Sequence, residues 1–333
     1  MFVYIYYEYI YYEKDKGSDR GVKGLSVAGI ERIFSINLRK ILCNVLNMAN
    51  RINEIRLRAG QPLMVIIDNM ERFVKSDGEI TLTYENAYIV TVNEIRETME
   101  YISNYSLYAY EEEMKQGYIT VAGGHRIGIC GKAIIENNTV KTLRYISFIN
   151  IRIAHEIIGC SDRLISKIYK DSDSIYNTLI ISPPGRGKTT LLRDLVRNIS
   201  NGYNGNYRGL NIGIADERSE IAACYLGIPQ NDVGIRTDVI DGIPKEAGIM
   251  MLIRTMSPKV IAIDEIGSKE DIKAIRQGIN CGCRFICTVH GDDLEDVRNK
   301  PVLGDMIKEK IFRRYMVINK WDKAERYKLV END

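Results

Sequence analysis

The stretch Ser182-Pro-Pro-Gly-Arg-Gly-Lys-Thr189 decides the fold, because its composition is that of a loop that closes around phosphate groups. It follows an apolar, strand-like run at 178–181 and precedes a helical pattern at 191–199 with leucine, valine and isoleucine on one face. A phosphate-binding loop requires this strand–loop–helix context. Its glycines let backbone N–H groups converge on phosphate oxygens, and the helix N-terminus adds the positive end of its dipole. The residues expected to contact a nucleotide are Ser182, Pro183, Pro184, Gly185, Arg186, Gly187, Lys188, Thr189 and Thr190.

The loop predicts ATP and Mg²⁺ as its ligands. Lys188 is placed to reach the β- and γ-phosphates, and the hydroxyl of Thr189 is placed to bind Mg²⁺. The usual pattern, G-x-x-x-x-G-K-[ST], begins with glycine, whereas Ser182 stands at that position here. Serine is small enough for the same turn. The alternative, a glycine- and proline-rich turn that carries a lysine, leaves the motifs further along the chain unexplained.

Four apolar residues at 260–263 lead into two carboxylates, Asp264 and Glu265. A continuous apolar run is typical of a strand buried on both faces, as in a parallel sheet covered by helices. Ligands bind at the carboxyl edge of such a sheet. We therefore expect Asp264 to hold Mg²⁺, directly or through water, and Glu265 to orient and deprotonate the attacking water. A strand that ends in two solvated acids is the alternative for this motif alone.

Composition places the chain among soluble globular proteins. Of its 333 residues, 45% are hydrophobic and 27% are charged, and the net charge is +2. This small net charge gives no general electrostatic reason to expect nucleic acid or an anionic membrane as the main ligand. The seven cysteines are an odd number without the spacing of a secreted disulfide framework, and no apolar run is long enough for a transmembrane helix. We therefore expect a cytoplasmic protein.

The length predicts two domains. Tyrosines dominate residues 1–12, and together with the polar stretch that follows they are interpreted as an extension over 1–24; an interfacial membrane anchor is the alternative. A smaller α+β domain is predicted at 25–165, because helical and strand patterns mix there without a nucleotide motif. Strands and helices alternate at 166–333, which predicts an α/β domain of the P-loop, RecA-like kind with a mostly parallel sheet.

Local patterns predict individual elements of both domains. In the second domain, a helix is expected from Pro244 to Met256, and a capping box formed by Ser268 and Asp271 predicts another through Ile279. Strands of the second domain are predicted at 178–181, 210–215, 260–263 and 285–289. In the first domain, a helix is predicted at 92–103 and strands at 53–58, 63–67, 117–121, 125–129 and 149–154.

Two further motifs accompany the phosphate loop and the carboxylate pair. The acidic cluster Asp216-Glu-Arg-Ser-Glu220 follows the second predicted strand, and Thr288-Val-His290 ends the strand after Glu265. A phosphate loop, an acidic cluster, a carboxylate pair and a histidine in this order resemble the secretion ATPase superfamily of hexameric motors. Other stretches, among them Gly123-Gly-His-Arg-Ile-Gly128 and Gly227-Ile-Pro-Gln230, are similar to the stage III sporulation protein AA family of endospore-forming bacteria. The similar stretches come from both predicted domains.

The resemblance implies further site residues. Asp216 and Glu217 match the acidic box that shapes the nucleotide and Mg²⁺ site, and His290 matches a histidine that senses the γ-phosphate. A strand-end histidine bound to a neighbour is the alternative for His290. In this superfamily the first domain supplies arginines to the triphosphate, where an arginine can neutralise transition-state charge. The candidates here are Arg126, which we favour, Arg144 and Arg152. Arg218 and Arg254 of the second domain are the possible candidates within the same chain.

The resemblance also implies a function. It implies an ATPase that drives a transenvelope, secretion-like complex, located in the mother-cell cytoplasm and peripheral at the forespore membrane. The implied partners are further copies of the chain in a homo-hexamer and other stage III A sporulation membrane proteins, through which the chain contacts the membrane; no nucleic acid is expected. Two alternatives stay open: a nucleotide-gated assembly scaffold with little turnover, and a ring that translocates nucleic acid. Intact Lys188, Asp264 and Glu265 favour hydrolysis over the scaffold.

Overall fold

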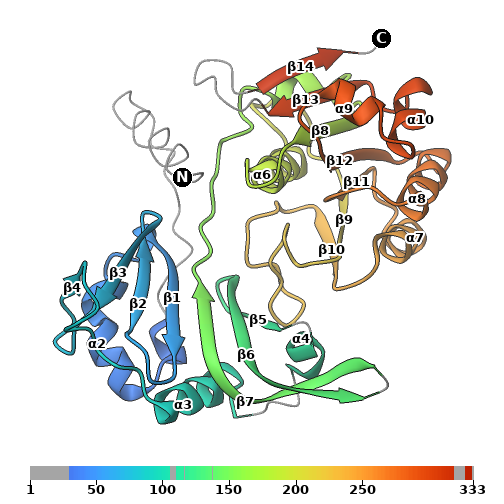
Figure 1. Cartoon of the computed structure of the whole chain (residues 1–333). Helices are drawn as coiled ribbons and strands as arrows, with labels where there is room; N and C mark the ends of the chain where they lie inside the picture. Colours follow the sequence, from blue (N-terminus) through green and yellow to red (C-terminus); the bar gives the residue numbers. More distant parts are fainter. Residues whose placement is uncertain (1–29, 106–109, 116, 137, 319–326, 332–333) are drawn as a thin grey trace. The chain divides into compact units, whose positions relative to one another are not determined.

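The computed structural model describes residues 30–105, 110–115, 117–136, 138–318 and 327–331, so the extension predicted at 1–24 lies outside the described residues. The chain divides into two compact units, one with residues up to Glu156 and one from Ile157 onward (Figure 1). Helix α5 (Ile165–Ile168) buries Ile165 and Ile168 in the core of the second unit. The limit predicted between residues 165 and 166 falls inside this helix, because local sequence does not mark where tertiary contacts change from one core to the other.

The second unit is built around a sheet whose described strands follow the order β10-β9-β11-β12-β8-β13-β14. Every neighbouring pair is parallel except β13 and β14. The predicted α/β fold with a mostly parallel sheet is therefore confirmed. The strands are β8 (Thr178–Ser182), β9 (Ile212–Asp216), β10 (Thr237–Asp241), β11 (Val260–Ile263), β12 (Arg284–His290), β13 (Arg314–Ile318) and β14 (Tyr327–Glu331).

Helices cover both faces of this sheet, which explains why its central strands are continuous apolar runs. Ile180 of β8 is buried with Leu191 of α6 on one face, whereas Leu179 and Ile181 are buried with Leu252 of α7 on the other. Each such side chain contributes about 1.5–3 kcal/mol when fully buried. The helices of this unit besides α5 are α6 (Lys188–Asn201), α7 (Lys245–Thr255), α8 (Lys269–Asn280), α9 (Leu294–Arg298) and α10 (Leu303–Lys308).

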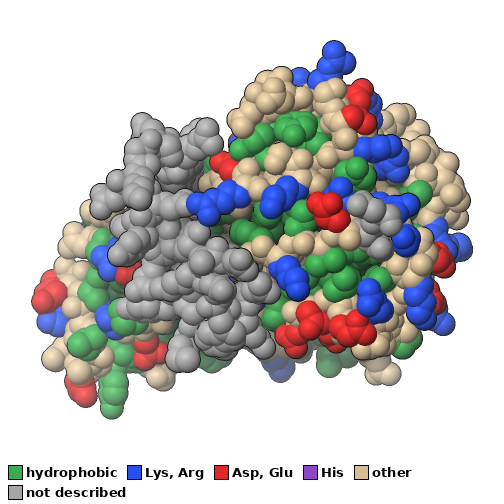
Figure 2. Space-filling view, turned by 90° about the horizontal axis from the view of Figure 1, so that it is seen from above, with side chains coloured by type: hydrophobic (Ala, Val, Ile, Leu, Met, Phe, Trp, Pro, Cys, Tyr) green, Lys and Arg blue, Asp and Glu red, His purple; other side chains and the backbone are tan. Residues whose placement is uncertain are grey.

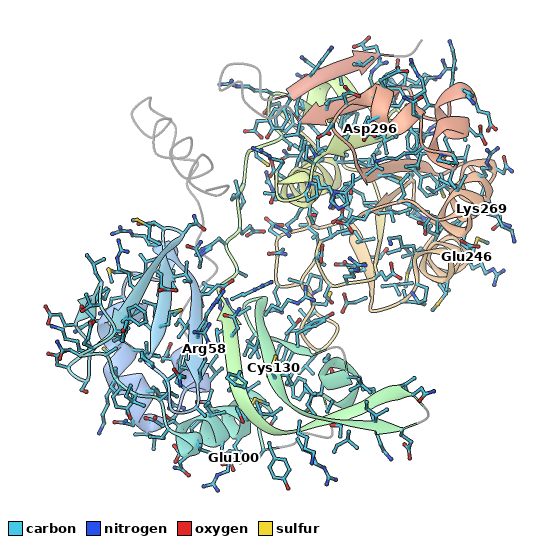
Figure 3. The ribbon with its side chains drawn as sticks, viewed as in Figure 1. Arg58, Glu100, Cys130, Glu246, Lys269 and Asp296 are labelled. Atoms are coloured by element: carbon cyan, nitrogen blue, oxygen red, sulfur yellow. The ribbon has the colours of Figure 1, made fainter. Side chains whose placement is uncertain are left out.

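Local sequence signals set the starts of α7 and α8. Pro244 is the N-cap of α7, one residue before the helix begins. Ser268 is the N-cap of α8, and its hydroxyl accepts the N–H of Asp271 at 3.0 Å in the predicted capping box. Glu246 and Lys269, labelled in Figure 3, lie in the first turns of α7 and α8.

The first unit has a sheet of its own, with the order β4-β3-β2-β1-β7-β6-β5 and antiparallel pairing throughout its described strands. Ile55 and Leu57 of β1 are buried with Leu38 of α2 and Ile95 of α3, so one face of the sheet forms the core. Strands β6 and β7 extend beyond their predicted ranges as a long hairpin. The elements are η1 (Ile30–Ile33), α2 (Ile36–Leu46), η2 (Ala49–Arg51), β1 (Ile52–Arg58), β2 (Met64–Ile67), β3 (Met70–Val74), β4 (Ile80–Thr81), α3 (Val92–Ile102), α4 (Glu111–Lys115), β5 (Tyr118–Val121), β6 (His125–Glu136) and β7 (Thr139–Arg152).

The surface mixes both signs of charge. In the face that Figure 2 shows, Lys and Arg side chains alternate with Asp and Glu side chains and with hydrophobic ones, in keeping with the net charge of +2. Among the described residues, no helix combines the length and the apolar character needed to cross a bilayer.

Candidate active site

The predicted phosphate loop joins β8 to α6 and is bent by two glycines. Gly185 has φ 70° and Gly187, the N-cap of α6, has φ 88°, a region that side chains with a Cβ rarely adopt. Ser182, at the position where the usual pattern has glycine, is fully buried and donates its hydroxyl to the carbonyl of Pro183 at 2.9 Å. The serine thus adds a hydrogen bond within the turn. Helix α6 then begins at Lys188.

The loop and the carboxylate pair meet at the carboxyl ends of β8 and β11. The ammonium of Lys188 lies 2.6 Å from Oε1 of Glu265 and 3.4 Å from Oδ1 of Asp264. The hydroxyl of Thr189 donates to Oδ2 of Asp264 at 2.5 Å. The two motifs that sequence analysis singled out are therefore in direct contact, although strands β9 and β10 and helix α7 separate them along the chain.

Thr288 contacts the carboxylate of Asp264 and the backbone of Glu265. Its hydroxyl donates to Oδ1 of Asp264 and accepts the backbone N–H of Glu265 at 2.9 Å. The parallel pairing of β11 with β12, which sets Ile263 opposite Cys287, brings this fully buried threonine to the site. Local sequence does not assign Thr288 a role of its own; the available signal is a polar residue within the apolar part of β12.

Glu265 is positioned by an unusual backbone conformation. Its φ is 53°, and a residue other than glycine held in this left-handed region costs about 1–3 kcal/mol. Its Oε1 lies 2.9 Å from Nε2 of His290, as well as close to Lys188. Burial alone raises the pKa of Glu265, but hydrogen bonds and charges from Lys188 and His290 outweigh it, and the pKa is lowered. The carboxylate is therefore ionised at neutral pH and able to accept a proton.

Asp216 organises the loop after β9. Its carboxylate is buried and accepts the backbone N–H groups of Glu220, Ile221 and Ala222 at 2.9, 3.0 and 2.9 Å. Because both oxygens are used in this way, the contacts in the structure are those of a residue that shapes the loop. Burial, helped by the nearby charge of Asp241, raises the pKa of Asp216 to about 6 despite these three donors.

This raised pKa predicts a stability that depends on pH. Between its ordinary value of 3.8 and about 6, the folded protein binds more protons at Asp216 than the unfolded chain does, so stability falls as pH rises through this window. The total change is about 3 kcal/mol. We expect urea unfolding followed by circular dichroism from pH 4 to pH 7 to show wild type losing this stability relative to Asp216→Asn, which cannot titrate there. Parallel pH curves for the two proteins would contradict the assignment.

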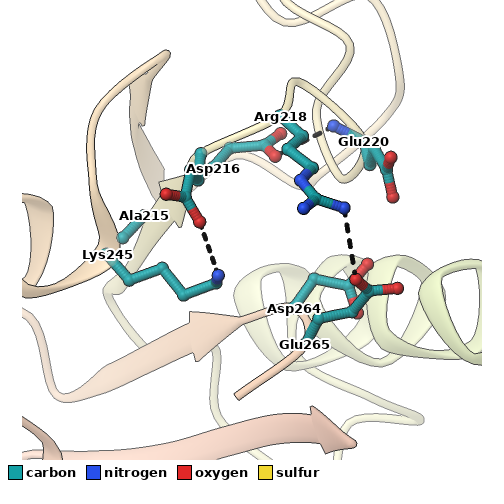
Figure 4. A pocket seen from close by; sticks show the side chains of 8 residues that line it. Ala215, Asp216, Arg218, Glu220, Lys245, Asp264 and Glu265 are labelled. Carbon is teal, nitrogen blue, oxygen red and sulfur yellow. Dashed lines mark hydrogen bonds and ion pairs between the residues drawn. The ribbon is translucent and has the colours of Figure 1, made fainter. Parts of the chain in front are cut away.

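A pocket opens between this loop and the carboxylate pair (Figure 4). Glu217 forms an ion pair with Lys245, the first residue of α7, at 2.5 Å. Arg218 points across the pocket to Oε2 of Glu265, with its Nη1 3.5 Å away. Neither pairing can be predicted from local sequence, since both depend on how distant segments meet. The residues that line the pocket are Ala215, Asp216, Glu217, Arg218, Glu220, Lys245, Asp264 and Glu265.

The candidate arginines lie in the first unit, whereas the phosphate loop lies in the second. Arg126 of β6 stacks over the ring of Tyr118, with 3.6 Å between its guanidinium carbon and the ring centroid. Arg152 of β7 is opposite Arg126 in the sheet. Arg144, also in β7, is exposed. Their suggested role at the triphosphate stays a prediction.

Comparison with known proteins places these features in a wider group. Residues 27–332 match the family described as "Sporulation stage III, protein AA". The chain is 42% identical over 269 residues to stage III sporulation protein AA of Bacillus subtilis strain 168, which covers 81% of this chain and 83% of that protein. Two solved structures are similar in fold. The Yersinia pseudotuberculosis ATPase DotB has a TM-score of 0.54 at 15% identity, covering 89% of this chain and 78% of that one. The pilus retraction motor PilT with bound ADP has a TM-score of 0.55 at 14% identity, covering 88% and 83%.

Proposed function

The chain belongs to the Sporulation stage III, protein AA family, and from this we propose that it is an ATP-binding and ATP-hydrolysing motor of a transenvelope, secretion-like sporulation complex. The observation that carries the proposal is the convergence of Lys188, Thr189, Asp264 and Glu265 at the carboxyl ends of β8 and β11. A lysine and a threonine at the start of a helix, after a glycine-rich loop and beside paired carboxylates, fit the phosphates of a nucleoside triphosphate.

Mg²⁺ fits the oxygen atoms between α6 and β11. The Thr189 hydroxyl and the Asp264 carboxylate are hard donors 2.5 Å apart, and ligands of this kind suit Mg²⁺. Held by these two residues beside a bound nucleotide, the ion would offset the negative charge of the phosphates. Thr288 holds the other oxygen of Asp264 and so fixes the orientation of the carboxylate.

The pairing of Lys188 with Glu265 implies that ATP binds before Glu265 acts as a base. A triphosphate carries more negative charge than a carboxylate, so we expect ATP to draw the Lys188 ammonium from Glu265 to the β- and γ-phosphates. Oε1 of Glu265, which keeps its contact with His290, can then also accept a hydrogen bond from water and take its proton. Without nucleotide, the base stays occupied by the lysine at 2.6 Å.

Membership of the sporulation family supports a proposal for where in the cell this activity takes place. We place the protein in the mother-cell cytoplasm, peripheral at the forespore membrane, where it would act with other stage III A sporulation membrane proteins. The likeness in fold to a pilus retraction motor and to a DotB ATPase supports a motor over a static component. We further propose that the working form is a homo-hexamer, in which Arg126 of one copy reaches a triphosphate bound by another copy.

Hydrolysis is therefore expected to depend on assembly. If turnover needs an arginine from another copy of the chain, specific ATPase activity should rise with protein concentration as oligomers form. The experiment is a dilution series of the full chain, with phosphate release and sedimentation measured on the same samples. Arg126→Ala should sediment as wild type does and still bind nucleotide, yet lose the rise in activity. Full specific activity in a demonstrated monomer would overturn the hexamer proposal and favour a site that is complete within one chain.

A further inference from the structure

Three side chains surround the carboxylate of Glu265, each from a different segment. Lys188 at the start of α6 lies 2.6 Å from Oε1, and His290 at the end of β12 lies 2.9 Å from the same oxygen. Arg218, in the loop after β9, lies 3.5 Å from Oε2. At that distance the arginine contributes an ion pair without a short hydrogen bond, so its contact with Glu265 is the loosest of the three.

The backbone that carries Arg218 is held firmly. Asp216 accepts three N–H groups of the same loop, as described above. From α6, Arg193 donates to the carbonyl oxygens of Glu220 and Ile221 at 2.7 and 2.6 Å. Ser219, with φ 52°, donates its hydroxyl to Asp241 at the end of β10. These contacts attach the loop to the helix whose first residue is Lys188. The backbone of Arg218 is therefore held in place.

The side chain of Arg218, by contrast, can move. It is 66% exposed. Of the two cations that line the pocket, Lys245 is 15% exposed and lies 2.5 Å from Glu217. Arg218 is therefore the lining cation able to turn from Glu265 toward a ligand that enters between the loop and the carboxylate pair (Figure 4).

We propose that Arg218 binds the terminal phosphate of the nucleotide within the same chain and lets the site distinguish a triphosphate from a diphosphate. A terminal phosphoryl group offers more oxygens and more negative charge than the Glu265 carboxylate, and the planar guanidinium matches its geometry with two parallel N–H groups. Lys188 and Arg218 now flank one carboxylate and would then flank one phosphate. The departure of both cations leaves His290 as the remaining side-chain neighbour of the Glu265 carboxylate, which can then act as a base only when the γ-phosphate is present. This inference rests on the proposed function.

The test compares a triphosphate with a diphosphate on the full chain. Binding of ADP and of the non-hydrolysable analogue AMP-PNP, each with Mg²⁺, is measured by calorimetry for wild type, Arg218→Ala and Arg218→Lys. We expect Arg218→Ala to weaken AMP-PNP binding about 10- to 100-fold, the loss for a hydrogen bond to a charged group, and to leave ADP binding unchanged. The affinity of Arg218→Lys for AMP-PNP should lie between those of wild type and Arg218→Ala, because lysine keeps the positive charge but lacks the two parallel N–H groups of arginine.

The matched control is Arg276→Ala in α8, which removes an exposed arginine paired with Glu309 on the same unit. It should bind both nucleotides as wild type does. Equal weakening of ADP and AMP-PNP by Arg218→Ala, or no weakening of either, overturns the assignment of Arg218 while the proposed function stands. Failure of the unaltered chain to bind either nucleotide overturns the proposed function itself.

Discussion

Replacing Lys188 with alanine is expected to abolish ATP hydrolysis and to weaken ATP binding about 10- to 100-fold. The lysine side chain is only 8% exposed and points at the two carboxylates that we expect to face the phosphates. Its ammonium would be the charge nearest to the β- and γ-phosphates, and no other buried cation contacts that carboxylate pair among the described residues. Phosphate release and equilibrium binding of a fluorescent ATP analogue measure the two effects.

Loss of Lys188 also removes the buried cation that Asp264 and Glu265 share, so a drop in stability must be separated from a loss of chemistry. Circular dichroism of the variant at the assay temperature does this. Lys269→Ala, which removes an exposed lysine at the start of α8, is the charge-matched control and should hydrolyse ATP normally. Hydrolysis at the wild-type rate by folded Lys188→Ala would refute the assignment of the phosphate loop.

Local sequence predicts best those parts of the fold that depend on a residue's own polarity or on interactions between residues close together in the chain. The apolar runs of β8 and β11 signal burial on both faces, and the capping box at Ser268 is a contact between neighbours in sequence. Strand β10 was missed because it follows an irregular crossover instead of a helix and carries two aspartates in five residues. Strands β13 and β14 were missed as well, since their pairing with β8 and with each other joins distant parts of the chain.

The same division runs through the candidate site. The phosphate loop and the carboxylate pair can be recognised from their residue types and spacing. The contact between these two motifs could therefore be predicted. The partners of those residues could not: Thr288 comes from strand register, and Lys245 and Arg218 from the fold of a loop. Asp216 shows the limit most clearly. The resemblance implies only that Asp216 shapes the nucleotide and Mg²⁺ site, whereas the three backbone N–H groups that its carboxylate accepts become visible only in the folded loop.

Replacing Glu265 with glutamine is expected to slow ATP turnover by about 10²- to 10⁴-fold, the usual contribution of a general base. Glutamine keeps the size and the hydrogen-bonding shape of the side chain but cannot take a proton from water. ATP binding should be retained or strengthened, because a neutral amide replaces the ion-pair partner that lies nearest to Lys188. Single-turnover hydrolysis and nucleotide binding, measured side by side, separate the chemical step from affinity.

The neighbouring carboxylate supplies the comparison that decides between roles. Asp264→Asn should lose Mg²⁺-dependent nucleotide binding, since Asp264 is the acid that meets the Thr189 hydroxyl, whereas Glu265→Gln should bind ATP and hold it. If Asp264→Asn proved the milder lesion for Mg²⁺-dependent binding, the division of labour between the two acids would be wrong. A wild-type rate already as low as that of Glu265→Gln would instead mean that Glu265 is not used as a base. In that case ATP would act by occupying the site, and the nucleotide-gated scaffold would replace the motor as the better account of this chain.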